Sequence, residues 1–220
     1  GAKQLSIDLQ PPRMAVPYEM LEKALLPVEY KPDIALGSMK MTLYFQEKNR
    51  ARLQRTLSSF MEQFEKSCII EEIKGYKGKY RGFLQEDSYT KTLVKEKKIL
   101  EMSFDGYFFD EEKEVIFDGK TAGMMYAEGS RKMPCVIEVT AKAALTDYRM
   151  TLNGEEYVIE RLAPGKTIII DGTGKVTLEG INAFDAVDLW EFPKVHAGGN
   201  ALTFSSAQAK VRIRYVPMWL

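Results

Sequence analysis

The residue types that most often carry out acid–base or metal chemistry are scarce in this sequence of 220 residues, which has one histidine and two cysteines. His196 lies in the turn-rich stretch 192–199. A general base needs a nucleophile or substrate within hydrogen-bonding distance, and no recognisable nucleophile is close to His196 in the sequence. We therefore interpret it as an exposed loop histidine. A closed tetrahedral zinc shell needs more histidine and cysteine ligands than one chain offers, so no structural zinc site is expected.

Two short segments resemble ligand-binding loops without meeting their requirements. The acidic run at residues 110–114 could offer oxygens to calcium, but it lacks the alternating spacing and the turn glycine of a calcium loop, which favours a solvated linker. Residues 163–167 end in Gly-Lys-Thr like a phosphate-binding loop, but Glu160 stands where the first glycine is required and its carboxylate would face the phosphate. Paired carboxylates for glycoside hydrolysis stay open, because their separation depends on the fold. No pair stands out, so we predict no enzyme, no cofactor and no metal site.

The remaining candidates are cysteines and aromatic residues. Cys68 and Cys135 are each followed by two apolar residues, which is typical of small buried side chains, and the sequence neither favours nor excludes a disulfide between them. Aromatic rings near the C-terminus could form a flat face on which sugar rings stack, although core or interface packing is the commoner use of such rings. These rings belong to Trp190, Phe192, Tyr215 and Trp219. We take Trp190 and Trp219 as candidate contacts with a glycan or a protein partner.

Charge and hydropathy exclude several classes of protein. Lysine plus arginine and aspartate plus glutamate are equal at 31 each, so the chain lacks the basic excess with which proteins bind nucleic acids or anionic membranes. No apolar run approaches the roughly 18 residues of a membrane helix, and no signal sequence is evident at the start. Hydrophobic residues at 45% suffice for a folded core. We expect a folded chain that binds neither nucleic acid nor membrane.

The pattern of apolar residues in the first half of the sequence predicts strands around one helix. Apolar residues alternate with polar ones at residues 4–9, before Pro11 and Pro12, and again at 38–45. Asn49 can cap a helix at about 49–66, whose apolar residues recur at spacings of three and four. Residues 13–37 lack a clear period, with a short helical or extended stretch possible around 18–26. Further strands are predicted at residues 68–73, 75–84 and 98–109.

The second half has the pattern of an all-β sandwich or barrel, with short strands separated by turn residues. The charged run at 110–114 is the best domain boundary. We therefore expect domains at residues 1–112 and 113–220, and a mainly β fold with an α+β first module. Asn153-Gly154 predicts a tight hairpin between 148–152 and 155–159. Further turns are predicted at 164–165 and 171–174, and strand 201–204 is expected to pair through 205–208 with 210–215.

Four segments of the C-terminal third are distinctive because of the order in which they follow one another. They are Lys166-Thr167-Ile168-Ile169-Ile170-Asp171-Gly172, Phe192-Pro193, Gly198-Gly199-Asn200-Ala201-Leu202-Thr203-Phe204 and Val211-Arg212-Ile213-Arg214-Tyr215. This order resembles the C-terminal domain of siphophage distal tail proteins, the Dit-like tail component family. In mechanical terms Asp171-Gly172 turns a hairpin, Gly199 frees the backbone before Asn200, and Tyr215 closes the sheet. The first half resembles the family's ring-forming domain more loosely, because the expected aromatic-rich opening strand is not evident before Lys3.

The resemblance implies a structural virion protein of a phage or prophage. Such a protein forms a head-to-tail homo-hexameric ring at the distal tip of a long non-contractile tail, and it joins the tail tube to the tail-tip and receptor-binding proteins. Its second domain would be a galectin-like or jelly-roll β-sandwich that faces outward. The implied location is the virion tail tip, with assembly in the host cytoplasm. The chief alternative is a carbohydrate-binding module that grips cell-surface glycan through Trp190 or Trp219, and an enzyme is the third hypothesis.

Overall fold

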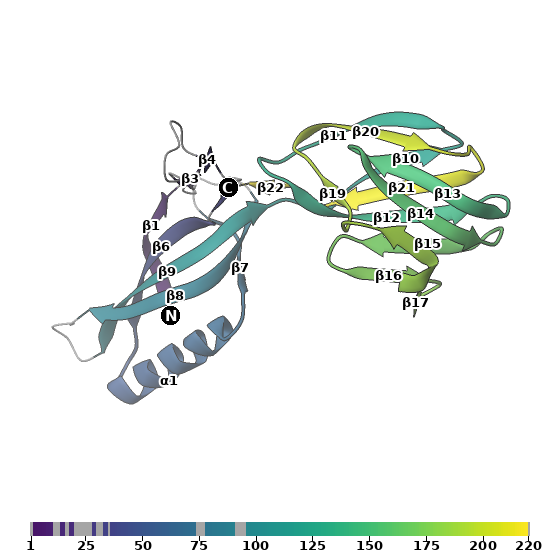
Figure 1. The fold of residues 1–220 in the computed structure, drawn as a ribbon. Helices are drawn as coiled ribbons and strands as arrows, with labels where there is room; N and C mark the ends of the chain where they lie inside the picture. The colour runs from purple at the N-terminus through teal and green to yellow at the C-terminus, as the bar shows by residue number, and fades with distance from the viewer. Residues whose placement is uncertain are drawn as a thin grey trace. The chain divides into compact units, whose positions relative to one another are not determined.

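The structure is a computed structural model that describes residues 2–10, 14–15, 18–19, 28–29, 33–34, 36–73, 78–90 and 96–219. The chain divides into two compact units, residues 1–108 with residue 220, and residues 109–219 (Figure 1). The boundary that the charged run suggested, near residue 112, falls shortly after this division. Each unit has its own cluster of buried apolar side chains.

The first unit is built on one sheet with a helix beside it. The strands follow the order β1-β6-β9-β8-β7 across the sheet, and β6 pairs antiparallel with both β1 and β9. The alternating patterns at 4–9 and 38–45 thus form strands as predicted. The bounds are β1 Ala2–Gln10, β6 Gly37–Gln46, β7 Cys68–Ile70, β8 Lys79–Thr90 and β9 Lys97–Phe109, with the helix α1 Arg50–Met61 and the short helix η1 Glu62–Phe64.

Helix α1 begins where the sequence predicted, because the side chain of Asn49 accepts a hydrogen bond of 2.9 Å from the backbone N–H of Arg52. This bond satisfies one of the free donors of the first turn. Leu53 and Leu57 lie four residues apart, on the face that turns toward the buried residues of the sheet, and both are buried. The α-helix ends at Met61, and η1 follows it, so the helix is shorter than the predicted 49–66.

Two predictions for the first unit need correction or lie partly outside the described residues. Strand β8 continues to Thr90, well beyond the predicted end at residue 84. Residues 85–90 are mostly polar, so no apolar alternation marks them, and the strand is defined by its place in the sheet between β9 and β7. Of the stretch predicted around 18–26, only 18–19 are described. They form β3, which pairs with β4, and β2 pairs with β5. Each of these strands has two residues, and the bounds are β2 Met14–Ala15, β3 Tyr18–Glu19, β4 Val28–Glu29 and β5 Asp33–Ile34.

The second unit is a β-sandwich, as predicted. One sheet has the order β10-β21-β12-β15-β16-β17 with β19 paired to β12, and the other has the order β11-β20-β13-β14-β18. The bounds are β10 Lys113–Asp118, β11 Ala122–Ala127, β12 Met133–Ala141, β13 Leu145–Leu152, β14 Glu155–Leu162, β15 Thr167–Asp171, β16 Lys175–Leu178, β17 Ile181–Asn182, β18 Val187–Leu189, β19 Lys194–Val195, β20 Gly198–Phe204, β21 Ala209–Tyr215 and β22 Met218–Trp219, with the short helix η2 Phe184–Ala186.

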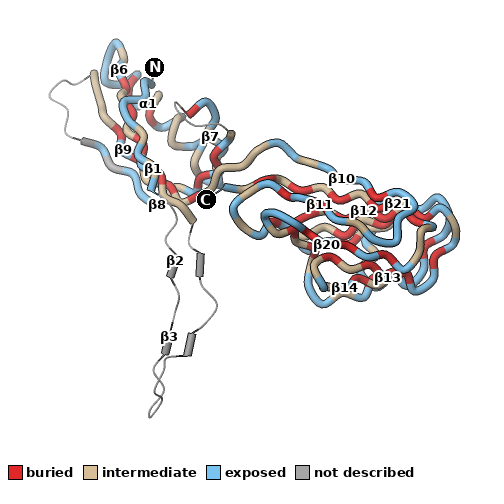
Figure 2. Tube along the Cα trace, turned by 90° about the horizontal axis from the view of Figure 1, so that it is seen from above, coloured by how far each residue is buried: buried red, intermediate tan, exposed pale blue. Residues whose placement is uncertain are grey.

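The core of the sandwich follows from period-two alternation. Figure 2 shows buried and exposed residues alternating along these strands. Ile137 and Ile213 from one sheet and Met150 and Ile159 from the other are fully buried and belong to one cluster. Burying a side chain of this size stabilises the fold by about 1.5–3 kcal/mol. The two inner faces therefore supply most of the stability of the unit.

The turns are partly as predicted. Asn153 and Gly154 both have positive φ, 55° and 92°, and they join β13 to β14 in the predicted hairpin. The predicted pairing of 201–204 with 210–215 is wrong. β20 pairs with β11 and β13, whereas β21 pairs with β10 and β12 in the other sheet, so residues 205–208 cross between the sheets. Both strands bury alternate apolar residues, and that pattern does not distinguish two neighbours in one sheet from two strands that face each other.

Candidate interaction surfaces

His196 lies between β19 and β20 and is half-buried, so the expectation of an exposed histidine is wrong. Burial lowers the pKa of its imidazole, and the positive charges of Lys132 and Lys194 lower the pKa further. Its backbone N–H and C=O both bond to the side chain of Asn200, at 2.7 and 2.8 Å. The backbone of His196 thus has a structural role, and among the described residues no nucleophilic side chain is hydrogen-bonded to its ring.

The cysteines are free thiols in different units. Cys135 is buried in β12, and burial followed by the negative charge of Asp171 raises the pKa of its thiol to about 12. Cys68 is partly buried at the start of β7, and burial raises the pKa of its thiol as well. A thiol with a raised pKa is a poor nucleophile at neutral pH. Both cysteines therefore act as small apolar side chains, as the sequence predicted.

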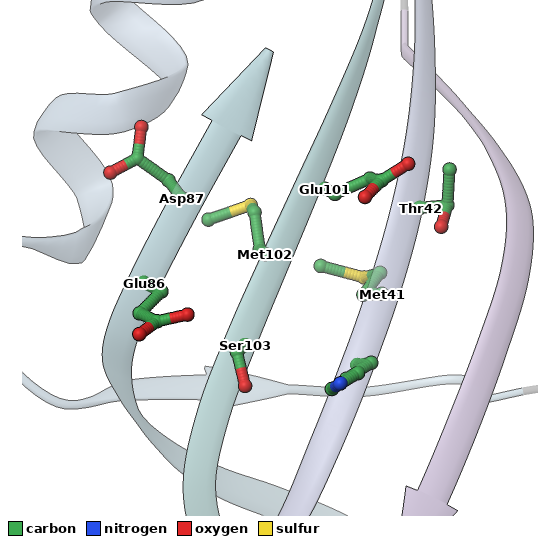
Figure 3. Close-up of a pocket in the computed structure, with 8 residues that line it drawn as sticks. Met41, Thr42, Glu86, Asp87, Glu101, Met102 and Ser103 are labelled. Atoms are coloured by element: carbon green, nitrogen blue, oxygen red, sulfur yellow. The ribbon is translucent and has the colours of Figure 1, made fainter. Parts of the chain in front are cut away.

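A shallow pocket of about 470 Å³ lies in the first unit (Figure 3). Its floor contains the thioethers of Met41 and Met102, and three exposed carboxylates, Glu86, Asp87 and Glu101, surround them. Within the described ranges no group of three or more histidine, cysteine, aspartate or glutamate side chains is arranged to hold a metal ion. The carboxylates that line the pocket are exposed to solvent, whereas acid–base catalysis usually relies on titratable groups whose pKa is shifted by burial in a cleft.

The four aromatic residues predicted near the C-terminus do not form one face. Trp190 is 92% exposed, after β18, whereas Tyr215 is buried in the core and its hydroxyl accepts a hydrogen bond from the backbone N–H of Glu128. Phe192 packs partly against the core. Trp219 is 38% exposed, and its indole N–H donates a 2.9 Å hydrogen bond to Asp110. Trp190 is therefore the one ring of the four that is free to stack on a ligand.

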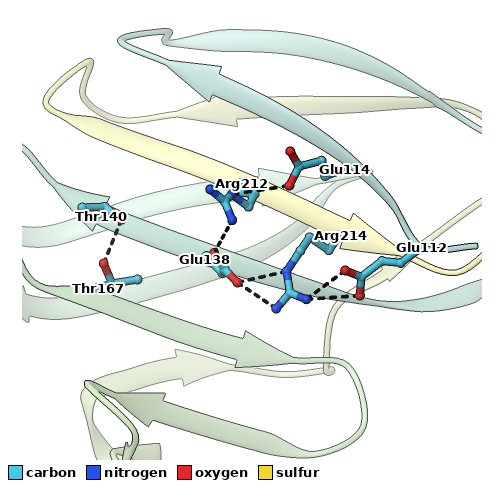
Figure 4. Close-up of polar contacts among 7 residues, drawn as sticks. All are labelled: Glu112, Glu114, Glu138, Thr140, Thr167, Arg212 and Arg214. Atoms are coloured by element: carbon cyan, nitrogen blue, oxygen red, sulfur yellow. Dashed lines mark hydrogen bonds and ion pairs between the residues drawn. The ribbon is translucent and has the colours of Figure 1, made fainter.

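An ion-pair network joins residues 112–114 to β12 and β21 of the seven-stranded sheet (Figure 4). Glu138 of β12 lies between Arg212 and Arg214 of β21, 2.7 Å from the guanidinium of Arg214 and 3.7 Å from that of Arg212. Arg214 also makes bonds of 3.0 and 3.1 Å to Glu112, and Arg212 reaches Glu114 at 3.7 Å. Hydrogen bonds to Glu112 raise the pKa of Arg214 although burial opposes the shift. The acidic run at 110–114, predicted as a solvated linker, is therefore tied to the last long strand.

The residue that sequence reasoning missed is Asn200, the buried polar residue of the sandwich. Its carboxamide oxygen accepts bonds of 2.7 Å from Asn153 and from the backbone N–H of His196, and its carboxamide nitrogen donates to the carbonyls of His196 and Gly198. This side chain ties the β13–β14 turn to the loop before β20. From the Gly-Asn motif we expected Gly199 to be the residue whose backbone takes a conformation that favours glycine. The positive φ, 92°, belongs to Gly198 instead.

The described helices include none long and apolar enough to cross a bilayer.

The known proteins to which this chain is similar are phage tail proteins. The sequence model described as the siphovirus-type tail component, C-terminal domain, matches residues 128–219. No curated protein sequence matches the chain. The crystal structure of the SPP1 Dit (gp 19.1) protein is similar with a TM-score of 0.77 at 9% identity, over 99% of this chain and 94% of that chain. Two structures of the phage P2 baseplate in its activated conformation, with Ca and with Sr, give TM-scores of 0.49 and 0.46 at 10% and 11% identity, over 98% and 97% of this chain and 90% of each of those chains.

The match to the tail component domain agrees with the order of the motifs in the C-terminal third, all of which lie inside residues 128–219. The likeness to SPP1 Dit spans both units and shows the fold. The chain therefore has the fold of SPP1 Dit over almost its whole length, and its residues 128–219 match the siphovirus-type tail component, C-terminal domain.

Proposed function

We propose that this chain is a structural protein of the distal tail of a siphovirus or a related prophage, where it links the tail tube to the host-adhesion apparatus. The observation that carries the proposal is the tail-component domain at residues 128–219 within a chain that has the SPP1 Dit fold. SPP1 Dit is described as a paradigm of the hub adsorption apparatus in phages that infect Gram-positive hosts. The partners in this proposal are the tail tube and the tail-tip and receptor-binding proteins, met first in the host cytoplasm during assembly.

The first unit, extended to residue 112, is proposed to form a head-to-tail homo-hexameric ring, with the galectin-like sandwich of 113–220 facing outward. A head-to-tail interface uses two different patches of each subunit. The sheet of the first unit ends in two different strands, β1 and β7, and each carries an apolar side chain that is 51% exposed, Leu5 and Ile69. Edge strands present unpaired backbone groups that favour association. In the ring, the β1 edge of one subunit would meet the β7 edge of the next.

Light scattering over a concentration series tests the ring. We expect the mass to reach six chains at high concentration, and Leu5→Lys or Ile69→Lys to hold it at lower values, because a charge would be desolvated at the contact. Ile181→Lys is the matched control, since Ile181 is 73% exposed in the second unit. A wild-type chain that stays monomeric at every concentration would favour the carbohydrate-module alternative. Lysine variants that assemble like the wild type would contradict the proposed edges.

A catalytic role is not part of the proposal. The thiol of Cys135 is buried with a raised pKa, and the backbone of His196 is bonded to Asn200. The pocket of the first unit combines exposed carboxylates with thioethers. These features support a protein whose work is assembly.

Carbohydrate binding by the second unit is the second candidate, and the exposure of Trp190 favours it. A ring that is 92% exposed offers both faces for stacking on a sugar. Calorimetric titration of the chain with cell-wall glycans of a Gram-positive host tests it, because heat reports binding whether or not the tryptophan is present. Binding that Trp190→Ala abolishes and Trp219→Ala retains would support a glycan site. Binding that both variants retain would place any site elsewhere.

A further inference from the structure

Four strands end the two sheets of the second unit, and three of them carry features that discourage pairing with another chain. β10 contains Lys113, Glu114 and Asp118, while β17 and β18 have only two and three residues. β11 has six residues, contains no charged residue or proline, and pairs with β20 without a register shift. Charges, prolines, bulges and short length are the devices that protect sheet edges from strand addition. β11 has none of these devices.

The side of β11 that faces away from β20 pairs with no other strand among the residues whose placement is described. In an edge strand, every second residue turns its N–H and C=O outward, where an extended chain can receive them. We call this row of backbone groups the β11 edge. It offers the hydrogen-bonding pattern that extended peptides use when they add a strand to a sheet.

The side chains beside the β11 edge are apolar on both faces of the sheet. Met125 is buried in the sandwich, whereas Met124 and Tyr126 are 61% and 75% exposed on the outer face. Their partners on β20 are the small residues Ala201 and Gly199, so the side chains of Met124 and Tyr126 extend further from the sheet than those of their partners. A Cβ placed on Gly199 would lie 3.8 Å from the ring of Tyr126. An added strand would therefore find an apolar thioether and an aromatic ring on which to pack alternate side chains.

We propose that the β11 edge accepts an extended, uncharged segment of a tail protein other than this chain. The choice of a tail protein rests on the proposed function. The segment is uncharged because a charge placed beside Met124 and Tyr126 would lose hydration without gaining a partner. Lys120 precedes the strand, and Glu128, which follows it, is ion-paired with Lys113, so the apolar stretch is bounded at both ends.

The head-to-tail ring proposed above argues against pairing of the β11 edge with the β11 edge of a second copy of this chain. Two antiparallel copies of one strand would be related by a two-fold axis and would join two chains only. A cyclic head-to-tail ring does not generate such an axis between its subunits. A different protein, carried once or more around the ring, meets no such restriction.

Photo-cross-linking in assembled particles identifies the occupant. A benzophenone amino acid placed at residue 126 is expected to cross-link to a different virion protein, at an extended segment that mass spectrometry of the product locates. A product with a second copy of this chain, or no product from particles that contain the chain, would overturn the inference. Absence of the wild-type chain from the particles would instead overturn the proposed function, so the two failures are distinguishable.

Edge-blocking variants give the second measurement. Met124→Lys and Tyr126→Lys are expected to leave the mass of the purified ring unchanged and to yield tails that lack the partner protein. Ile116→Lys is the matched control, because Ile116 is 43% exposed on β10, the edge strand of the other sheet. Control tails should retain the partner. Tails with the normal amount of every protein in both edge variants would overturn the proposal.

Discussion

Replacing Asn200 by alanine is expected to destabilise the second unit more than any other single polar change in it. The side chain is fully buried and makes four hydrogen bonds, with Asn153, with both backbone groups of His196, and with the carbonyl of Gly198. A buried hydrogen bond contributes about 1 kcal/mol net, so four bonds give about 4 kcal/mol. Water can reach the half-buried His196 and the exposed Gly198 and replace part of this. We therefore expect a loss of about 3 kcal/mol.

Urea unfolding followed by tryptophan fluorescence measures this loss directly. Both tryptophans, Trp190 and Trp219, belong to the second unit, and Trp190 follows β18 of the sandwich, so its fluorescence reports the unfolding of that sandwich. The midpoint should fall with an unchanged slope, and the melting temperature should fall by at least about 10 °C in a unit of this size. Asn182→Ala is the matched control, because Asn182 is exposed in β17.

A second variant separates hydrogen bonding from the loss of volume. Asn200→Asp keeps the shape and the accepting oxygen, removes the two donors, and places a charge in a buried site, so it should destabilise the unit at least as much as alanine. A loss below about 0.5 kcal/mol in Asn200→Ala, equal to that of the Asn182→Ala control, would refute the role assigned to Asn200.

Three further outcomes follow from the charges and thiols. Glu138→Gln should reduce the free energy of unfolding by about 1 kcal/mol at low salt and by less at high salt, because it leaves two neighbouring arginines without their shared acid, while the exposed Glu160→Gln should have no effect. The lowered pKa of His196 means that the unfolded chain takes up a proton at a higher pH than the folded chain. The free energy of unfolding should therefore fall as the pH decreases below the ordinary histidine value of 6.5, and a pH series should show that His196→Gln removes this slope. In a thiol-reagent assay Cys68 should react slowly in the native chain and Cys135 only after unfolding, and rapid native labelling of Cys135 would contradict its burial.

Local patterns in the sequence predicted the elements whose stability depends on local chemistry. The strict alternation at 38–45 and the three–four spacing after Asn49 predicted β6 and α1, because one face of each must be buried. Asn153-Gly154 predicted its hairpin, because both residues tolerate positive φ. The pairing of β20 and β21 was predicted wrongly, because strands on opposite sides of a sandwich share the same alternation.

The candidate surfaces were harder to predict, because they depend on what covers each side chain. Trp190 and Tyr215 both belong to the aromatic residues that the sequence singled out near the C-terminus, yet Trp190 is almost fully exposed and Tyr215 is buried. Asn200 gave no signal of burial, since an amide can be buried only when other polar groups satisfy it, and one of its partners is the side chain of Asn153, 47 positions away. The open edge of β11 became evident only once the order of strands in both sheets was known.

Immunogold electron microscopy of assembled particles, with antibodies against residues 113–220, tests the central claim most directly. The account predicts gold at the distal end of the tail, in tails that carry the wild-type chain, and no gold on particles from which the gene has been removed. Labelling along the tail shaft or on the capsid, or particles that contain none of this chain, would contradict it.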